Sequence, residues 1–379
     1  MANLHRTMQA RDPAEEHRAS TPLELFFDLC FVVAVAQAGS ALHHAVDEGR
    51  VMHGLGAYLM VFFAIWWAWM NFTWFASAYD TDDVPYRCAV LVQIVGSLII
   101  AAGVGRAFTA EDFTVVVIGY GVMRAALVCQ WLRVAVEDPS GRATAVRSAV
   151  GLVALQCLWV GFLFVPPELR GPAWAACALL DLAVPVLAAQ AQTSWHPGHI
   201  AERYGLFTLI VLGESVGAAA LAFQDAFALG HTAQLVVTAL GGVLVMTALW
   251  WLYFSRDAAV LLTSARAALV WGYGHYMVFA SSAAVGAGLS IVASREEGQT
   301  EIPEALASAS VTVPVAVFLT ALWFLHRRSG GTAAPVAITT ALVLASTFTP
   351  AAVPLTGLAL VALVTLRELQ HANTPPTPA

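Results

Sequence analysis

The sequence predicts an all-α, polytopic transmembrane helical bundle of about 12 spans, with ten to twelve as the range. Two observations predict it. Of the 379 residues, 59% are hydrophobic and only 11% are charged, whereas about 25% are charged in an average soluble domain. Apolar runs near the roughly 20 residues that cross a bilayer recur along the whole chain. This composition excludes a soluble globular protein and a disordered chain, and the formal charge of -7 argues against nucleic-acid binding.

Each predicted span is an apolar run bounded by polar, glycine or proline residues. In chain order, the runs are Pro22–His43, Met52–Ser77, Arg87–Arg106, Phe113–Val134, Val146–Val165, Pro172–Gln190, Tyr204–Phe223, Gln234–Phe254, Ala267–Ala293, Val311–Leu325, Pro335–Phe348 and Ala351–Leu366. The last two runs are short and are separated only by Thr349 and Pro350. They form either two spans or one hairpin that enters the membrane and returns.

The spans divide the chain into two six-span halves, residues 21–190 and 204–368, joined by a linker at 191–203. A polar segment, residues 1–20, precedes them. It does not resemble a secretory signal, so we expect it to be retained. The tail, residues 369–379, is rich in proline and threonine, and we expect it to be disordered.

Arginine counting predicts the orientation, because cationic residues bias loops toward the cytoplasm. All 18 cationic side chains are arginines. With the N-terminus inside, thirteen arginines fall on the inner side, four on the outer side, and Arg124 lies within a span. The asymmetry predicts an even number of spans with both termini in the cytoplasm.

A weak internal repeat relates the two halves. Trp66-Trp67 and the later Phe72, Asp80 and Arg87 recur in order at an offset of about 180–190 residues. The second copy comprises Trp250-Trp251, Phe254, Asp257 and Arg266; Leu25, Phe26 and Asp28 likewise align loosely with Leu206, Phe207 and Glu214. Two parallel six-helix repeats are a transporter architecture, although tryptophan pairs are also common interfacial anchors.

Cofactor signals are absent from the sequence. We find no flavin, nicotinamide, haem or nucleotide motif. The five cysteines stand singly in apolar runs, so we expect buried small hydrophobic residues and no disulfide or zinc site.

The charged residues within the spans are the main functional signal, because a charge at membrane depth costs roughly 2.5–3.5 kcal/mol on insertion scales. They are Asp28, Arg124, Asp181 and Glu214, with His275 as a fifth polar member. Three carboxylates against one arginine require a proton, a bound cation or water. We therefore hypothesise a common polar site. The alternatives are that Arg124 pairs with one carboxylate and only fixes the bundle, and that His275 is a hydrogen-bonded interior residue.

Asp28 and Glu214 lie in predicted spans that carry another charged residue near their beginning. Thr21 to Glu24 reads as a capping box with proline at the first helical position, so Glu24 is a predicted helix cap, with Asp28 on the same face. In the seventh span, Arg203 precedes Glu214, which stands between Gly213 and Gly217. This glycine spacing predicts close approach by another helix.

A loop between the second and third spans carries Asp80, Asp82 and Asp83 before Arg87. Three acids within four residues can hold Mg²⁺, or they can be a solvated loop. Two histidines three residues apart, His196 and His199, can bind a metal, but no third ligand is evident.

Two motifs resemble the low temperature requirement protein A (LtrA) family of bacterial multi-span membrane proteins. The first is Thr21–Leu29 (TPLELFFDL), followed by Gln37; the second is His199–Ser215. The Trp66-Trp67 pair and the stretch Tyr79–Arg87 also fit, and the likeness runs from about Thr21 to Leu366. The resemblance implies a multi-span protein of the bacterial inner membrane and supplies no substrate or catalytic residues.

Three functions remain open at this stage. The leading hypothesis is transport of a small solute or ion coupled to H⁺ or another cation, with Asp28 and Glu214 exchanging protons and Arg124 as the fixed counter-charge. The alternative is a membrane-embedded, Mg²⁺-dependent enzyme that acts on an isoprenoid diphosphate or a lipid, using Asp80, Asp82 and Asp83 beside an aromatic helix. The third is a protein that senses or stabilises the membrane without turnover.

Overall fold

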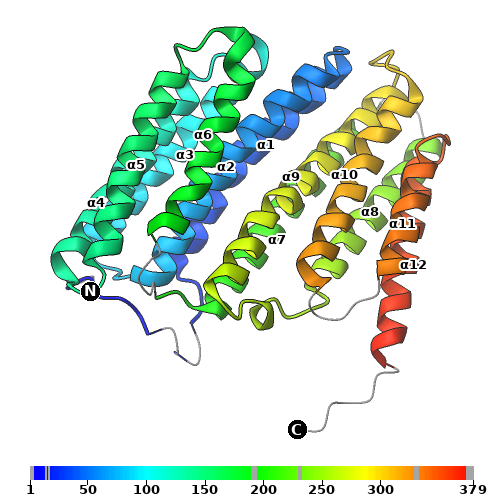
Figure 1. Cartoon of the computed structure of the whole chain (residues 1–379). Coiled ribbons are helices and arrows are strands. Elements are labelled where there is room, and N and C mark those ends of the chain that lie inside the picture. Colours follow the sequence, from blue (N-terminus) through cyan, green and yellow to red (C-terminus); the bar gives the residue numbers. More distant parts are fainter. Residues whose placement is uncertain are drawn as a thin grey trace. The chain divides into compact units, whose positions relative to one another are not determined.

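The predicted all-α fold is confirmed. The computed structural model describes residues 4–12, 15, 18–188, 194–228, 233–327 and 333–372, and it contains twelve α-helices, one short 3₁₀ turn and no strand within those ranges (Figure 1). Of the described helices, eleven are long and apolar enough to cross a membrane. The helices are α1 (Pro22–Asp47), α2 (Val51–Tyr79), α3 (Val84–Ala110), α4 (Thr114–Glu137), α5 (Arg142–Phe162), α6 (Pro167–Ala188), α7 (Pro197–Ala228), α8 (Ala233–Phe254), α9 (Ala265–Glu296), α10 (Glu304–His326), α11 (Ala333–Ser346) and α12 (Ala352–Ala372).

Two helices differ most from their predicted runs. Helix α7 begins at Pro197, within the predicted linker and seven residues before Tyr204. Helix α11 has only 14 residues, which at 1.5 Å per residue is about 21 Å, less than the roughly 30 Å hydrocarbon core. The predicted tail beyond Ala372 lies outside the described residues.

The chain separates into two compact units. Unit 1 comprises residues 1–38 and 56–207, and unit 2 comprises residues 39–55 and 208–379. Helices α1, α2 and α7 contribute residues to both units. The predicted division into two six-span halves stays a prediction, since unit 2 also includes the turn between α1 and α2.

Small residues bring the helices of each unit close together. In unit 1, Gly96 of α3 faces Gly119 of α4, and a Cβ at Gly119 would lie 2.7 Å from the Gly96 carbonyl oxygen. In unit 2, a Cβ at Gly288 of α9 would lie 2.1 Å from the carbonyl oxygen of Ser310 on α10. Membrane helices pack in this way because lipid provides no hydrophobic force between them.

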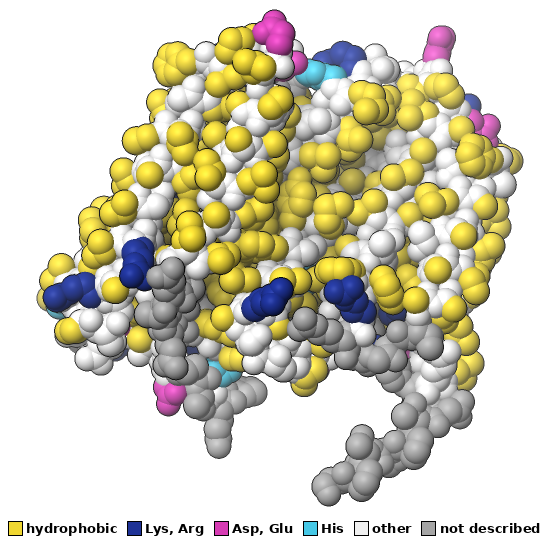
Figure 2. All heavy atoms as spheres, viewed as in Figure 1, with side chains coloured by type: hydrophobic (Ala, Val, Ile, Leu, Met, Phe, Trp, Pro, Cys, Tyr) yellow, Lys and Arg dark blue, Asp and Glu magenta, His cyan; other side chains and the backbone are white. Residues whose placement is uncertain are grey.

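Apolar side chains cover the outer faces of the helices, and the charged side chains in this view lie mostly near helix ends (Figure 2). This surface corrects the expectation for the cysteines. Cys88, Cys129 and Cys157 are exposed, Cys30 is half-buried, and only Cys177 is buried. An apolar residue on a membrane helix needs no burial inside the protein, because lipid is as apolar as the core.

The residues of the predicted repeat occupy different environments. Trp66 and Trp67 are each 1% exposed in unit 1, whereas Trp250 and Trp251 are each 44% exposed in unit 2. The repeat therefore stays a prediction from sequence.

Candidate functional site

The first turn of α1 has the predicted capping box. The Glu24 carboxylate accepts a hydrogen bond from the Thr21 backbone N–H at 2.8 Å, and the Thr21 hydroxyl accepts one from the Glu24 N–H at 3.3 Å. Capping uses Oε2 of Glu24, which leaves Oε1 to face the beginning of α7. Glu24 is thus both a helix cap and a member of an ionic cluster.

Arg203 of α7 joins the two acids of α1. Its Nε and Nη2 donate to both oxygens of Asp28 at 2.9 and 2.5 Å, and its Nη1 lies 2.8 Å from Oε1 of Glu24. The three side chains are at most 1% exposed. On α2, Trp69 donates its indole N–H to Asp28 at 2.6 Å, and Thr73 lies 3.4 Å from Arg203. A bidentate arginine–carboxylate pair of this kind is strong and fixes geometry.

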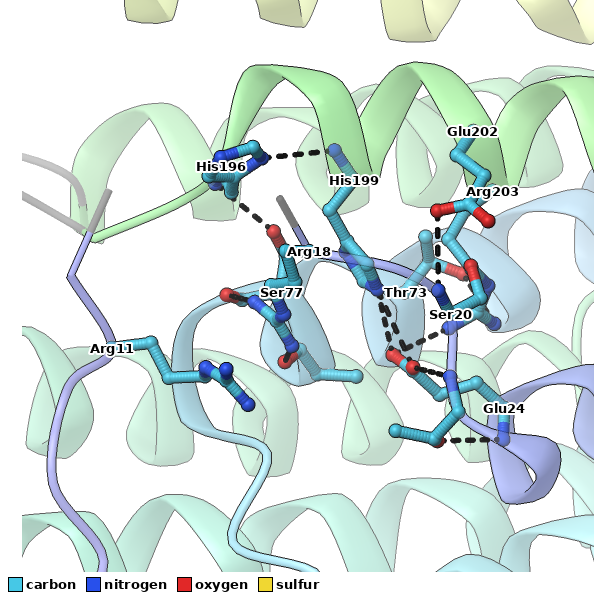
Figure 3. A network of polar contacts seen from close by, with 12 residues as sticks. Arg11, Arg18, Ser20, Glu24, Thr73, Ser77, His196, His199, Glu202 and Arg203 are labelled. Carbon is cyan, nitrogen blue, oxygen red and sulfur yellow. Dashed lines mark hydrogen bonds and ion pairs between the residues drawn. The ribbon is translucent and has the colours of Figure 1, made fainter. Parts of the chain in front are cut away.

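His199, one helical turn before Arg203, completes what we call the α1–α7 cluster: Glu24, Asp28, His199 and Arg203. Figure 3 shows Glu24, His199 and Arg203 of this cluster. The Nε2 of His199 lies 3.1 and 3.3 Å from the two oxygens of Glu24. This nitrogen therefore carries a hydrogen, because only a donor is stable against a carboxylate. The Nδ1 of His199 is buried and has no hydrogen-bond partner among the described residues.

His196 caps α7 and does not share a ligand with His199. Its Nδ1 accepts the backbone N–H of His199 at 3.1 Å, so its Nε2 donates to the carbonyl oxygen of Glu15 at 2.8 Å. The two rings thus have different partners. The part of the chain that the structure describes holds no group of three histidine, cysteine or acidic residues placed to bind a metal.

The segment before α1 packs against the cluster. The Arg18 guanidinium donates to the carbonyl oxygens of Ser77 and Ala76, at the end of α2, and the Ser20 N–H donates to Glu202 of α7 (Figure 3). Asp80 lies at the edge of the cluster. Burial, and then the charge of Glu24, raise its pKa to about 6.

The charges of the cluster do not cancel. Two carboxylates face one arginine and a neutral histidine, which leaves one net negative charge. Adding Arg18 and Asp80 at the edge leaves the sum unchanged. An uncompensated buried charge is costly, whereas one proton on His199 or Glu24 makes the cluster neutral.

Arg124 and Asp181 form a second buried pair in unit 1. A guanidinium nitrogen of Arg124 donates to one oxygen of Asp181, and Trp159 donates its indole N–H to the other at 2.6 Å. This pair shares no charged residue with the α1–α7 cluster. The predicted common site is therefore divided, because Asp28 takes Arg203 as its partner and Asp181 takes Arg124.

The other two predicted members lie in unit 2. His275 is buried, and its Nδ1 and Nε2 bond the Trp271 carbonyl oxygen at 2.8 Å and the Tyr253 hydroxyl at 3.0 Å. This is the hydrogen-bonded interior residue of the alternative interpretation. Glu214 is half-buried on α7.

The close approach predicted at Gly213 and Gly217 is wrong. No described atom lies within 4 Å of a Cβ built at either glycine. The helices meet instead at Gly286 of α9, where a Cβ would lie 2.6 Å from the Cα of Ser215. Glycine lacks a side chain, so its spacing alone does not reveal which face contacts a helix and which faces lipid.

The three acids before α3 do not converge. Asp83 caps α3 by accepting from Tyr86, and Arg133 donates to both of its oxygens at 2.9 and 2.6 Å. Burial alone would raise the pKa of Asp83, but the bonds from Arg133 hold it well below its usual range. Asp82 pairs with Arg87 at 2.8 and 2.9 Å, and Asp80 lies beside the α1–α7 cluster.

A spacing signal could have identified the cluster from sequence. Glu24 and Asp28 are four residues apart on α1, and His199 and Arg203 are four residues apart on α7. Residues at that spacing share one face of a helix, so two opposed acidic and basic faces were visible. The roles of Trp69 and Thr73 left no such signal.

The α1–α7 cluster joins the two motifs on which the family resemblance rests. Comparisons with known proteins confirm that resemblance. Residues 19–368 match the family described as bacterial low temperature requirement A protein (LtrA). The chain is also similar to a Rhizobium meliloti (strain 1021) protein named uncharacterized protein RA0937, with 28% identity over 267 residues. That match covers 67% of this chain and 62% of the relative's length. No solved structure matches the chain. With nearly its whole length matched and eleven helices able to span a bilayer, the chain belongs to the LtrA family of bacterial membrane proteins.

Proposed function

We propose that the protein is a proton-coupled transporter of a small solute or ion in the bacterial inner membrane, and that the α1–α7 cluster is its protonation site. One observation carries the proposal: the cluster is buried and holds two carboxylates against one arginine. Ionisable residues within membrane helices mark ion and proton pathways more often than they stabilise a fold.

The proton exchanges within the Glu24–His199 pair. Asp28 is fully engaged, because Arg203 and Trp69 supply three hydrogen bonds to its two oxygens. Glu24 shares its contacts among the Thr21 N–H, Arg203 and the His199 imidazole, and an imidazole titrates near neutral pH in the absence of perturbation. A proton on Glu24 removes the net charge of the cluster and weakens the attraction between Glu24 and Arg203. Helices α1 and α7 then separate at lower cost, which couples protonation to movement.

The cluster faces the cytoplasm in this proposal. It lies at the beginning of α1 and α7, and arginine counting places both of these helix ends on the inner side with both termini. Protons therefore exchange with the cytoplasm through the layer formed by Arg18, Ser20 and Asp80.

The acidic cluster that suggested the enzyme alternative does not favour it. Asp80, Asp82 and Asp83 have different partners and do not converge on a cavity lined by the aromatic residues of α2. A Mg²⁺-bridged diphosphate requires converging carboxylates. We therefore carry transport forward as the single proposed function.

Proton movement into liposomes tests the proposal. The purified chain is reconstituted with a trapped pH-sensitive dye, and inward gradients of sodium chloride, potassium gluconate, sodium formate or L-alanine are applied. We expect at least one solute to acidify wild-type liposomes and not empty ones. Glu24→Gln should reduce that flux at least tenfold while the helix keeps its cap, because glutamine also serves in a capping box.

The matched control is Glu168→Gln, which removes an exposed carboxylate from the first turn of α6. Its flux should equal that of the wild type. Unchanged flux in Glu24→Gln would remove the cluster from the mechanism, and wild-type inactivity with every solute would favour a protein without turnover. Glu214→Gln tests the second carboxylate of the original hypothesis: normal flux excludes Glu214.

A further inference from the structure

We propose that Arg124 and Tyr120 form a binding site for one small monovalent anion inside unit 1. The site is separate from the α1–α7 cluster. The inference concerns binding alone, so it stands or falls independently of proton transport.

Only part of the Arg124 guanidinium is used by the protein. Arg124 is 4% exposed, and one of its terminal nitrogens bonds Asp181. Its Nε and its other terminal nitrogen, Nη1, are buried and have no hydrogen-bond partner among the described residues. Nearly every buried polar group in a folded protein has such a partner, so these nitrogens indicate a missing acceptor.

Tyr120 supplies another unused group at the same place. It lies one turn before Arg124 on α4, and the Arg124 guanidinium carbon is 4.2 Å from the centre of its ring. The Tyr120 hydroxyl is also buried, and apart from the neighbouring Arg124 guanidinium it has no partner in the described part of the chain. Two neighbouring side chains on one helix face therefore leave polar hydrogens without an acceptor from another described residue.

Donor counting favours an anion over water. Nε carries one hydrogen, Nη1 two and the tyrosine hydroxyl one, which makes about four donors in all. A water molecule accepts about two hydrogen bonds and brings two donors of its own, for which the Tyr120 hydroxyl oxygen is the acceptor among these groups. A halide or carboxylate ion accepts from every side and brings no donor.

The surroundings provide space for one small ligand. A cavity of about 20 Å³ lies beside Tyr120, lined also by Trp159, Phe63, Phe113, Trp174 and neighbouring aliphatic residues. Arg124 is not among the lining residues. A volume of roughly 10–15 Å³ admits a water-sized particle, and the edges of aromatic rings carry partial positive charge. The cavity therefore suits a single halide ion.

Asp181 sets a condition on binding. An anion next to the intact pair leaves one net negative charge, so we expect binding together with a proton on Asp181. The charged and titratable groups facing Asp181 are Arg124 and Tyr120 from α4 and Cys177 from its own helix, α6. Arg124 is the only cation among them, and anion affinity should fall as pH rises.

Bromide binding to the full chain tests the inference. The protein is held in lipid nanodiscs, and its thermal unfolding midpoint is measured at pH 6 and pH 8 in sodium bromide and in sodium gluconate of equal ionic strength. We expect a saturable rise with bromide alone, larger at pH 6. Tyr120→Phe, which keeps the ion pair, should weaken bromide affinity about tenfold, the effect of one hydrogen bond to a charged group.

Two further variants complete the test. Arg124→Lys keeps the charge but replaces the planar guanidinium by a single ammonium nitrogen, which removes the donors at the positions of Nε and Nη1, and it should weaken the bromide effect at least tenfold. Tyr86→Phe removes an equally buried and unpartnered hydroxyl from α3 and should bind bromide like the wild type. Equal midpoints in bromide and gluconate for the wild type would show that water fills the site, and wild-type affinity in Tyr120→Phe would place any anion elsewhere.

Discussion

The two units handle buried polarity in different ways. Unit 1 buries full charges, in the α1–α7 cluster and in the Arg124–Asp181 pair. In the described part of unit 2, no aspartate, glutamate or arginine is fully buried, and the buried polar side chains are hydroxyls and histidines. Charges cost most in lipid and are kept where they serve a function, so the difference assigns the candidate chemistry to unit 1.

Unit 2 shows how polar residues can be buried without charge. Ser215, Ser281 and Ser282 donate to carbonyl oxygens one turn earlier in their own helices. These bonds satisfy each hydroxyl locally and also leave the helix surface small, which permits close packing. Stability in unit 2 should therefore depend on close packing between helices, whereas stability in unit 1 should depend on the pairing of buried charges with counter-charges.

Removal of Arg203 should have the largest effect on stability. Arg203→Leu leaves Glu24 and Asp28 buried without a counter-charge, and we expect a loss of about 3–5 kcal/mol in the free energy of unfolding. Titration with denaturing detergent in mixed micelles measures this loss. Arg266→Leu is the control in unit 2, because Arg266 is exposed in the first turn of α9, and its effect should stay within about 0.5 kcal/mol.

A triple variant separates charge from packing. Combining Arg203→Leu with Glu24→Gln and Asp28→Asn removes every charge of the cluster, and much of the lost stability should return. No recovery would mean that Arg203 acts by filling space. A loss below 1 kcal/mol in the single variant would mean that water reaches the carboxylates, and the contrast between the units would then disappear.

Much of the fold was accessible from sequence, whereas the pairing of its charges was not. Twelve apolar runs predicted twelve helices, and the capping box of Thr21 and Glu24 was confirmed. These features are local, so periodicity and spacing define them. Arg203 was associated only with Glu214 on its own helix, because the sequence does not say which helices meet.

In a membrane protein, it is hard to identify from sequence which face of a helix contacts another helix. In a soluble helix, an apolar stripe marks the face toward the core, but here the outer faces are apolar as well, as the exposed cysteines illustrate. The alternative interpretation paired Arg124 with one carboxylate, and nothing in the sequence selected Asp181 over Asp28. Polar residues four apart on one helix were the strongest unused signal.

Glycine substitutions in unit 2 test the role of helix approach, with a smaller expected effect. Gly286→Ala places a methyl group against the Ser215 backbone, and overpacking of this kind costs about 1–3 kcal/mol. Gly213→Ala meets no described atom within 4 Å, and it should be neutral or stabilise α7 by up to about 1 kcal/mol, since alanine favours helix over glycine. The same detergent titration measures both variants, and equal losses would contradict the helix contact at Gly286.

The smallest effect is a pH dependence confined to unit 1. Burial, and then the charge of Glu24, raise the pKa of Asp80 from 3.8 to about 6, so the folded state binds this proton more tightly than the unfolded state. The contribution of Asp80 is therefore fully present below about pH 4, near the unfolded pKa, and it is lost as pH rises through about 6. Asp80→Asn should remove that loss, so the stability difference between variant and wild type should grow between pH 4 and pH 7.

Asp82→Asn is the control with the opposite sign: the hydrogen bond from Arg87 lowers the pKa of Asp82, and the contribution of Asp82 to stability is lost only as pH falls below about 4. A flat difference for Asp80→Asn would mean that Asp80 is solvated like Asp82, and the polar region at the beginning of α1 would then end at Glu24.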